Sequence, residues 1–198
     1  MKKFVLASGN KGKVREFNEI LADLDIEVVP QSEFGVPEAE ETGLTFVENA
    51  ILKARNAAQH TGLPAIADDS GIEVDFLKGA PGIYSARYAG VGAGDEANLH
   101  KLLRDMDGVP EAERAARFQC LIVCIRHALD PVPLICQGTW EGRLATAPHG
   151  ENGFGYDPIF YVPEYDCMSA ELPREAKNRL SHRGQALRQL VAALKAKS

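Results

Sequence analysis

The sequence has no long hydrophobic run, no excess of positive charge and few cysteines. No apolar stretch in the 198 residues approaches the roughly 20 residues that cross a bilayer, and the first apolar stretch is too short for a signal peptide. A formal net charge of −6 argues against non-specific binding to nucleic acids or membrane surfaces. The fractions of 45% hydrophobic and 25% charged residues are typical of a soluble globular enzyme, and without a membrane span or signal peptide the protein is expected to be cytoplasmic.

The four cysteines do not follow a pattern typical of disulfides or of a zinc site. Cys120 and Cys124 share one predicted buried strand, in which four residues span about 13 Å, too far for a disulfide or for one metal ion. Cys136 lies in a second predicted strand, 133–140, and Cys167 is expected in a loop. We therefore expect reduced cysteines that serve mainly as packing residues.

Positions 65–71, with the sequence AIADDSG, carry the densest group of reactive side chains. Pro64 and Gly71 bracket this run, which predicts a short buried strand whose carboxyl end delivers Asp68 and Asp69 into a loop. Open α/β sheets bind their ligands at that end of the strands. Adjacent carboxylates repel each other, so the pair is typical of a Mg²⁺ site, although the same residue types also form ordinary turns.

A loop suited to phosphate follows the first predicted strand, residues 3–7. This loop, SGNKGK at 8–13, leads into a helix that begins near Lys11 and has apolar residues at helical spacing. A helix N-terminus offers free backbone N–H groups and a positive dipole end to an anion, and Lys13 adds a point charge. The loop is not a Walker A motif, because GxxxxGK[ST] is absent. An ordinary strand-to-helix turn is the alternative interpretation.

A second helix is predicted over 45–60, with a capping box, TFVE, at its start. Asn49, Lys53 and Asn56 recur at spacings of four and three and therefore share one stripe of this helix. A helix lysine is normally a solvated surface charge. Lys53 gains a functional role only if its stripe faces the 8–13 loop, which spacing alone does not show.

Two further polar stretches lie near the C-terminus. The loop GENGFGYDP at 150–158 contains Phe154, whose ring can stack on a nucleobase or fold back onto the core. Farther along, His182 and Arg183 fall in the first turn of the last predicted helix, where basic residues oppose the helix dipole. This unfavourable placement indicates that both side chains serve to donate hydrogen bonds rather than to stabilise the helix.

Taken together and in order, seven stretches resemble the inosine/xanthosine triphosphate pyrophosphatase family. They are SGNKGK at 8–13, EETGLTFVENAILKA at 40–54, AIADDSGIEVD at 65–75, GAPGIYSARYAG at 79–90, ARFQC at 116–120, GFGYDPIF at 153–160 and SHRGQAL at 181–187. Each motif alone is weak evidence for the family, but the set covers nearly the whole chain, and the sequence does not depart from the family pattern at the functional positions. The chain looks like a bacterial member.

The resemblance implies an α/β fold in one domain, 1–198, with an elongated mixed β-sheet flanked by helices and two lobes around a central substrate cleft. It also implies Mg²⁺-dependent hydrolysis of ITP, dITP and XTP at the α-phosphorus, which gives the nucleoside monophosphate and pyrophosphate. Such activity cleanses the nucleotide pool and prevents incorporation of these nucleotides into DNA and RNA. Family members are commonly homodimers that bind purine nucleoside triphosphates rather than nucleic acids or membranes.

The resemblance also implies roles for individual residues. Asp69 would position the metal and activate the attacking water, with Glu41 and Asp68 as further metal or water contacts and Ser70 at the substrate. The expected triphosphate contacts are Ser8, Gly9, Asn10, Lys11, Gly12, Lys13 and Lys53. The expected contacts around the base are Phe154, Gly155, Tyr156, Asp157, Lys177, His182 and Arg183.

Two rival interpretations remain. In the first, Asp68 or Asp69 is a covalent nucleophile that forms an aspartyl-phosphate, although a DxD arrangement is absent. In the second, the chain is a non-catalytic module that senses purine triphosphates. That module would account for the glycine-rich loops and Phe154, but it leaves the adjacent acids unexplained.

Overall fold

Seven strands form one mixed sheet, with the order β2-β1-β3-β4-β5-β6-β7, in the computed structural model, which describes residues 2–196. The strands are β1 (Lys2–Leu6), β2 (Ile26–Pro30), β3 (Ala65–Val74), β4 (Ala115–Ile125), β5 (Leu134–Leu144), β6 (Phe160–Val162) and β7 (Cys167–Met168). β1 pairs in parallel with β2 and β3, whereas β6 is antiparallel to β5 and β7. The predicted α/β fold with a mixed sheet is confirmed.

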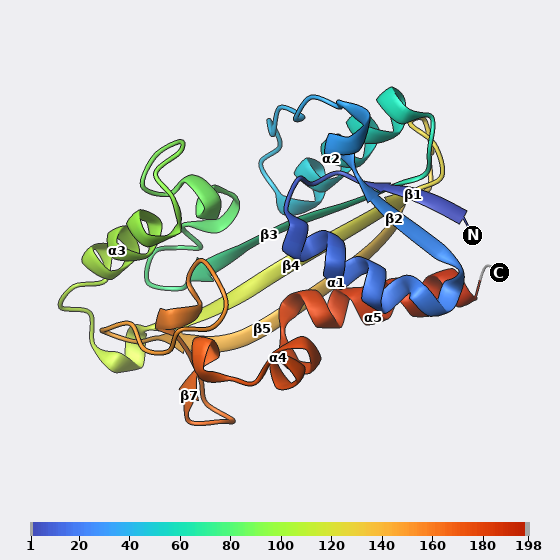
Figure 1. Ribbon diagram of the computed structural model, residues 1–198. Coiled ribbons are helices and arrows are strands. Elements are labelled where there is room, and N and C mark those ends of the chain that lie inside the picture. Colours follow the sequence, from blue (N-terminus) through green and yellow to red (C-terminus); the bar gives the residue numbers. More distant parts are fainter. Residues whose placement is uncertain (1, 197–198) are drawn as a thin grey trace. The chain divides into compact units, whose positions relative to one another are not determined.

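Helices connect and flank the strands (Figure 1). The α-helices are α1 (Lys11–Leu21), α2 (Phe46–Thr61), α3 (Asp95–Asp105), α4 (Arg174–Leu180) and α5 (His182–Lys195). Short 3-10 helices cover Ala22–Leu24, Gln31–Phe34, Gly82–Arg87, Glu111–Glu113, Asp157–Ile159 and Ser169–Glu171. Among residues 2–196, no helix combines the length and the apolar character that a membrane crossing requires.

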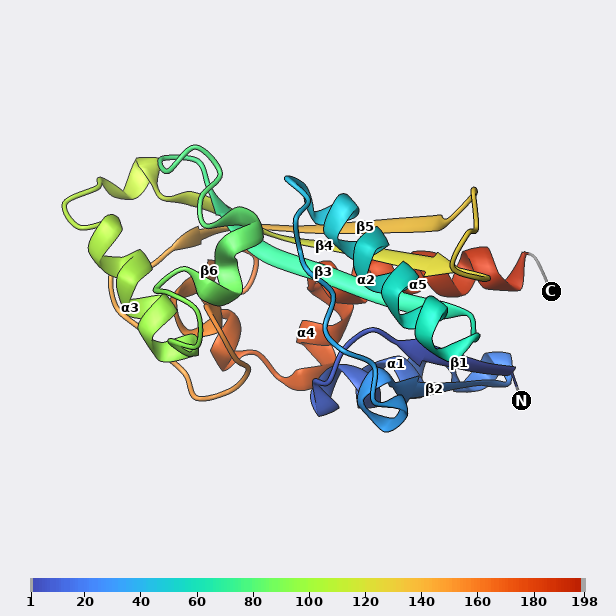
Figure 2. The ribbon, with the colours of Figure 1, turned by 90° about the horizontal axis from the view of Figure 1, so that it is seen from above.

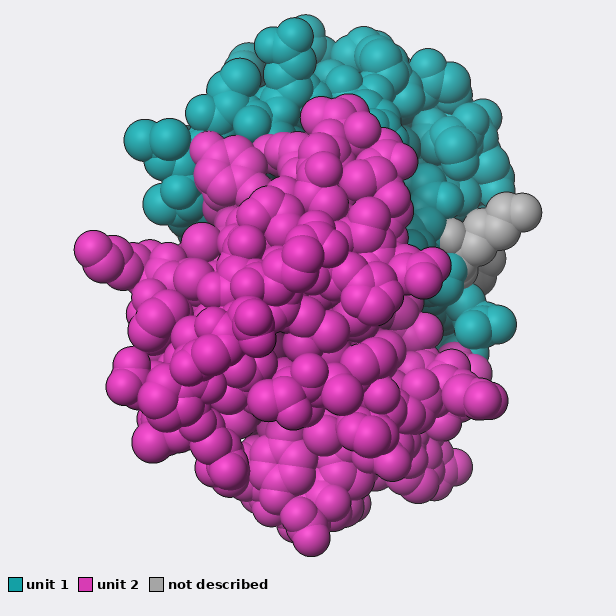
Figure 3. Space-filling model, turned by 90° about the vertical axis from the view of Figure 1, so that its left-hand side faces the viewer, with its two compact units in different colours: residues 1–69, 120–138, 185–198 teal, residues 70–119, 139–184 magenta. Residues whose placement is uncertain are grey.

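The chain divides into two compact units, each built from separate stretches (Figure 3). Unit 1 comprises residues 1–69, 120–138 and 185–198, and unit 2 comprises residues 70–119 and 139–184. The chain passes from one unit to the other within β3, β4, β5 and α5, so the units are not joined by linkers. The expected substrate cleft between two lobes stays a prediction.

Unit 1 has a hydrophobic layer on each face of its strands. Phe4 and Ile66 pack with α1 and α5 on one face, whereas Val5 and Ala65 pack with the alanines of α2 on the other. Figure 1 and the view from above in Figure 2 show α2 on the opposite side of β1 and β3 from α1. Neighbouring residues of a strand therefore enter different layers, as the period of two requires.

Local capping explains where the first two helices begin and where the second one ends. The side chain of Asn10 accepts hydrogen bonds from the backbone at the start of α1, and Thr45 accepts one from the Glu48 N–H at the start of α2. α2 ends at Gly62, which adopts the left-handed conformation with φ +70°. The helices predicted near Lys11 and over 45–60 are thus confirmed.

The prediction that the acidic strand ends at Gly71 is wrong. β3 continues to Val74, so Asp68 and Asp69 lie within the strand and not in a loop. Ile72 and Val74 extend it because both are buried in the core of unit 2. Since successive side chains of a strand point to opposite faces, the two carboxylates diverge instead of lying side by side.

The described cysteines are free thiols, and three lie where the sequence indicates. Cys120 and Cys124 lie in β4, and Cys136 lies in β5, which begins one residue after the expected start and extends four residues past the expected end. Cys167 is part of the short strand β7, so its expected placement in a loop is wrong.

Candidate active site

Two lysines reach the adjacent carboxylates of β3 from opposite faces of unit 1. Lys13, from the first turns of α1, forms an ion pair between its Nζ and Asp68 Oδ1. Lys53, from the middle of α2, places its Nζ 2.6 Å from Asp69 Oδ1 and 2.9 Å from the backbone oxygen of Asp68. Each carboxylate is nearly buried and has a cation of its own. The two lysines predicted to bind phosphate therefore converge on neighbouring residues.

Glu41 completes a cluster around Lys53. The Lys53 Nζ lies 3.3 Å from Glu41 Oε1, so the ammonium sits between that carboxylate and Asp69. Burial raises the pKa of Asp69, and the nearby charge of Lys53 offsets only part of this effect. Burial lowers the pKa of Lys53, but the charges of Asp69, Glu41 and Asp68 outweigh it and leave that pKa raised. Asp69 is thus a stronger base than an ordinary aspartate.

The acids of this cluster fit a two-carboxylate magnesium site. Asp69 Oδ2 is buried and has no hydrogen-bond partner among residues 2–196. Within that range, no group of three or more His, Cys, Asp or Glu side chains could hold a metal ion. Mg²⁺ needs fewer protein ligands, because it commonly takes one or two carboxylates and completes its shell with water and phosphate. Glu41 and Asp69 meet that requirement.

Asp68 has a different environment from these two acids. Its Oδ1 pairs with Lys13, and its Oδ2 accepts a hydrogen bond from the Cys120 thiol, with Sγ and Oδ2 separated by 3.3 Å. Both partners lie on the face of β3 opposite Asp69, so the geometry makes Asp68 the counter-ion of Lys13. Sequence reasoning did not identify Cys120 as a site residue, because only the pairing of β3 with β4 brings it to Asp68.

The predicted polar stripe of α2 holds the segment that carries Glu41. Asn49 Oδ1 accepts from the Gly43 N–H at 2.8 Å, and Asn56 Nδ2 donates to the Pro37 carbonyl at 2.7 Å. A Cβ atom at Gly43 would lie 2.8 Å from Asn49 Oδ1, so the chain comes close enough only because this residue is glycine. The stripe therefore fixes Glu41 beside Lys53.

The loop before α1 is more closed than the sequence indicates. Asn10 Oδ1 accepts from the Gly12 N–H at 2.9 Å and from the Lys13 N–H at 3.1 Å, and the Asn10 N–H donates to Ser8 Oγ at 3.1 Å. The expectation of free amides is therefore wrong for these positions, since Asn10 already caps the helix. The Lys11 side chain lies outside what the structure describes, while a Cβ atom at Gly9 would meet nothing within 4 Å.

The residues predicted around the base gather in unit 2. Phe154 is 56% exposed, and its ring centroid lies 5.5 Å from Lys177 Nζ and 5.8 Å from Arg183 Cζ. Both distances are within the range of cation–π attraction. His182, the residue before Arg183, is buried, and its ring stacks on Phe118 with centroids 4.8 Å apart. An exposed aromatic ring with two cations nearby is a platform for a flat, electron-rich ligand.

Asp157 supports this platform from below the surface. Its Oδ2 accepts from Lys177 Nζ and, at 2.8 Å, from the Phe154 N–H, while its Oδ1 accepts from Ser169 Oγ. The residue is buried, so it holds Phe154 and Lys177 in place. The structure thus gives Asp157 a positioning role within unit 2.

Other predicted contacts have structural partners in unit 2. Tyr156 is buried in the core, and its hydroxyl donates to the Ser85 carbonyl at 2.7 Å. The Gly155 N–H donates to Asp95 Oδ2 at 3.0 Å. Ser70 is half-buried in β3. Tyr156 and Gly155 therefore anchor the loop that presents the exposed aromatic ring.

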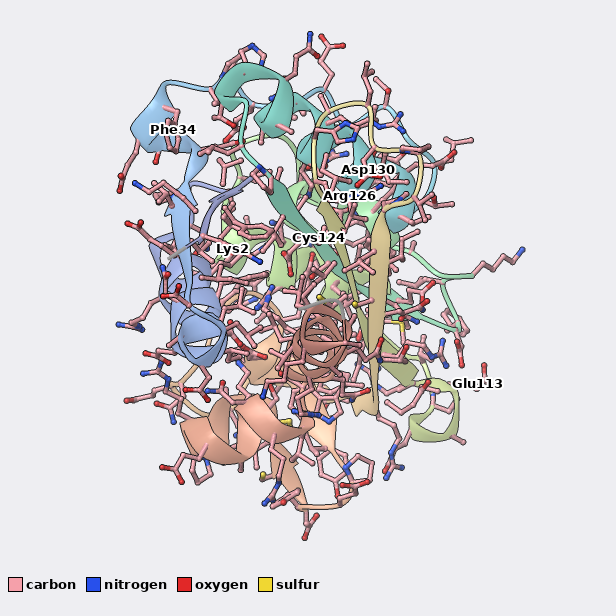
Figure 4. All side chains as sticks on the ribbon, turned by 90° about the vertical axis from the view of Figure 1, so that its right-hand side faces the viewer. Lys2, Phe34, Glu113, Cys124, Arg126 and Asp130 are labelled. Carbon is pink, nitrogen blue, oxygen red and sulfur yellow. The ribbon has the colours of Figure 1, made fainter. Side chains whose placement is uncertain are left out.

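A cavity in unit 1 lies at the other end of β1 from the 8–13 loop. Its wall includes Lys2, Cys124, Arg126 and Asp130, which are labelled in Figure 4, and none of the predicted site residues. Arg126 Nη2 lies 2.6 Å from Asp130 Oδ1, so its charge is compensated within the turn between β4 and β5. The predicted site residues therefore lie outside this cavity.

Known proteins match this chain over nearly its whole length. The model of the Ham1 family matches residues 4–193. A dITP/XTP pyrophosphatase of Vibrio parahaemolyticus is 66% identical over 198 residues, which cover 100% of this chain and 99% of that protein. The protein of the same name from Vibrio cholerae is 64% identical over 194 residues, or 98% of this chain and 97% of the relative.

A solved structure of a HAM1 protein from Coxiella burnetii superimposes with a TM-score of 0.94 and 52% identity, covering 99% of this chain and 100% of that chain. The Staphylococcus aureus Ham1 protein gives a TM-score of 0.90 and 45% identity over 100% of both chains. The family resemblance and the fold class inferred from the sequence are confirmed.

Proposed function

Because the chain belongs to the Ham1 family, we propose that it is a nucleoside triphosphate pyrophosphatase that hydrolyses dITP, ITP and XTP. Water attacks the α-phosphorus, the bond from that phosphorus to the bridging oxygen breaks, and the products are the nucleoside monophosphate and pyrophosphate. By removing deaminated purines from the nucleotide pool, this reaction would keep them out of DNA and RNA.

One observation carries the proposal. Lys13 and Lys53 converge from two helices on Asp68 and Asp69, which brings two cations to adjacent carboxylates of one strand. Phosphoryl transfer requires charge compensation and positioning more than covalent chemistry. In the proposed reaction, both ammonium groups bind phosphate oxygens and neutralise the charge that develops on the leaving pyrophosphate.

Mg²⁺ would be held by Glu41 and Asp69, and when bound it would supply charge neutralisation and a more acidic water. Asp69 Oδ2 is available to take the proton of the attacking water, since it has no hydrogen-bond partner among the described residues. The raised pKa of Asp69 makes it a better proton acceptor than an ordinary aspartate. Asn49 and Asn56 keep the Glu41 segment in place.

The cluster of unit 2 would recognise the base. Phe154 stacks on the purine ring, a contact worth about 1–3 kcal/mol by analogy with single-strand binders. His182 and Arg183 donate hydrogen bonds to the 6-keto oxygen of hypoxanthine or xanthine. Adenine carries an amino donor at that position, which would face the donors of His182 and Arg183. A buried site discriminates strongly against such a ligand, because its polar groups stay unpaired.

Product analysis tests this function. The purified protein is incubated with Mg²⁺ and equal amounts of ITP, GTP and ATP in ¹⁸O-labelled water. We expect rapid conversion of ITP to pyrophosphate and IMP that carries the label, with GTP and ATP nearly untouched. Chelation of the metal with EDTA should abolish turnover.

Each alternative has a distinct result. IDP with orthophosphate would place the cleavage at the wrong bond, and equal hydrolysis of all three nucleotides would refute base reading by His182 and Arg183. A phosphorylated protein in a single turnover would favour the aspartyl-phosphate route. Binding of ITP without any turnover would favour the sensor module.

We further propose that the enzyme acts in the cytoplasm, on the pool that polymerases draw from, and that it does so as a homodimer. Analytical ultracentrifugation should then give a mass twice that of the chain, and a monomer at the working concentration would refute the dimer. Fractionation of cells should recover the activity with the cytoplasm.

A further inference from the structure

Lys53 contacts both acids that would hold the proposed Mg²⁺. Its ammonium is 3.3 Å from Glu41 Oε1 and 2.6 Å from Asp69 Oδ1, the two acids that fit the metal. The ammonium also donates to the backbone oxygen of Asp68 at 2.9 Å. Only one side of Asp69 is used in this way, because its Oδ2 has no hydrogen-bond partner among residues 2–196.

An ammonium group and a magnesium ion compete for the same carboxylate oxygens. Two acids this close together are costly to hold without a cation, because they repel each other and one is buried. Lys53 removes that cost in the protein alone, since its charge lies between them. A metal ion that approaches Glu41 and Asp69 must therefore displace this contact or share the oxygens at short range with a positive charge.

We propose that Lys53 is a built-in competitor of Mg²⁺ that the triphosphate removes, so that metal and nucleotide bind together and not independently. The inference rests on the proposed function, in which Lys53 contacts phosphate. When the triphosphate arrives, its oxygens offer the ammonium a new partner and complete the magnesium shell. The coupling is reciprocal, so bound Mg²⁺ raises the affinity for the triphosphate by the same factor.

Lys13 provides a matched control. It makes a similar ion pair with the neighbouring Asp68, but on the face of β3 opposite Asp69. Both lysines are partly shielded, with side chains 20% exposed for Lys13 and 16% for Lys53. Neutralising either residue removes one unit of charge from unit 1. Only the change at Lys53 removes the competitor for the metal-binding acids.

The test is a calorimetric titration with Mg²⁺ in the absence of nucleotide. Lys53→Gln keeps a hydrogen-bond donor near Asp69 but removes the charge, and it should bind Mg²⁺ at least about tenfold more tightly than the wild type. Lys13→Gln should stay within about twofold of the wild type, because the affected charge is on the other face. Adding Asp69→Asn to Lys53→Gln should abolish the gain.

A second titration measures the coupling in the unmodified protein. A non-hydrolysable α,β-methylene analogue of ITP should raise the Mg²⁺ affinity of the wild type more than that of Lys53→Gln. Equal Mg²⁺ affinity of the wild type with and without the analogue would overturn the proposal even if Lys53→Gln did not fold. A folded Lys53→Gln protein with unchanged or weaker Mg²⁺ binding would overturn it too, as would an equal gain in Lys13→Gln.

These measurements separate the inference from the proposed function. Wild-type hydrolysis of ITP to IMP together with unchanged metal affinity in Lys53→Gln would remove the competitor role and leave the pyrophosphatase standing. Tighter Mg²⁺ binding by Lys53→Gln, in a protein that releases orthophosphate from ITP, would support the competitor role and refute the pyrophosphatase.

Discussion

The two adjacent acids of β3 should respond differently to the same isosteric change. Asp68→Asn removes the charge that holds Lys13, whereas Asp69→Asn removes the proposed metal ligand and base. Because the side chains point to opposite faces, the variants alter different contacts although they are neighbours in the sequence.

The expected magnitudes follow from burial. Asp69→Asn should lower kcat by at least about a thousandfold, since it removes proton transfer and a metal contact together. In Asp68→Asn the Lys13 ammonium can turn toward water, because that side chain is 20% exposed. The loss should therefore be about 1–2 kcal/mol of unfolding free energy, below the roughly 3–5 kcal/mol for a fully buried pair. That loss corresponds to a decrease in Tm of about 2–8 °C.

The assay combines steady-state kinetics on ITP with thermal unfolding. Asp68→Asn should raise KM about tenfold, because Lys13 is no longer aimed, while kcat stays within about fivefold of the wild type. Mg²⁺ dependence should be unchanged in this variant. If both variants lost kcat to the same extent at saturating Mg²⁺, the two carboxylates would act as one metal site, and the division inferred from opposite faces would be refuted.

Three further predictions address other contacts. Cys120→Val should raise the KM for ITP about two- to tenfold, because the hydrogen bond to Asp68 is lost, and Cys120→Ser should keep the KM near the wild-type value. Cys124→Val, a control four residues along the same strand, should leave the KM unchanged. Equal effects at both cysteines would mean that only packing matters. Arg114→Met should lower the unfolding free energy by about 3 kcal/mol or more, because the buried guanidinium serves several backbone carbonyls, and an unchanged denaturant midpoint would contradict this. Arg183→Ala should raise KM for ITP and erode discrimination against ATP, and unchanged selectivity in a competition assay would place base reading elsewhere.

The sequence predicted the parts of the fold that depend on local signals. The start of α1 was predicted from the helical spacing of its apolar residues and the start of α2 from its capping box, and both signals lie within a few residues of the helix start. The sequence predicts too early an end for β3, because Asp, Ser and Gly are typical turn residues, while the partners that keep the strand extended are far away in the sequence. Strand extension through Ile72 follows from tertiary packing, which no local pattern records.

The candidate site shows the same division between local and long-range information. Lys13 and Lys53 were identified from the motifs, but their assignment to different faces of one strand required the fold. Only the pairing of β3 with β4 identifies Cys120 as a site residue. The hydrogen bond that it donates to Asp68 joins residues 52 positions apart in the sequence. Tyr156 is the opposite case: the sequence predicts a substrate contact, whereas the structure places this loop residue in the core of unit 2.

The discontinuous course of the chain has a consequence for protein synthesis. Unit 1 begins with residues 1–69, yet Ala186, Leu187 and Leu190 of α5 belong to the core layer that covers Phe4 and Ile66. A ribosome must therefore translate most of the message before the first strands can bury their apolar face. During that interval the nascent chain exposes an apolar, aggregation-prone surface. We therefore expect early binding of chaperones and a completed fold only after the last helix emerges.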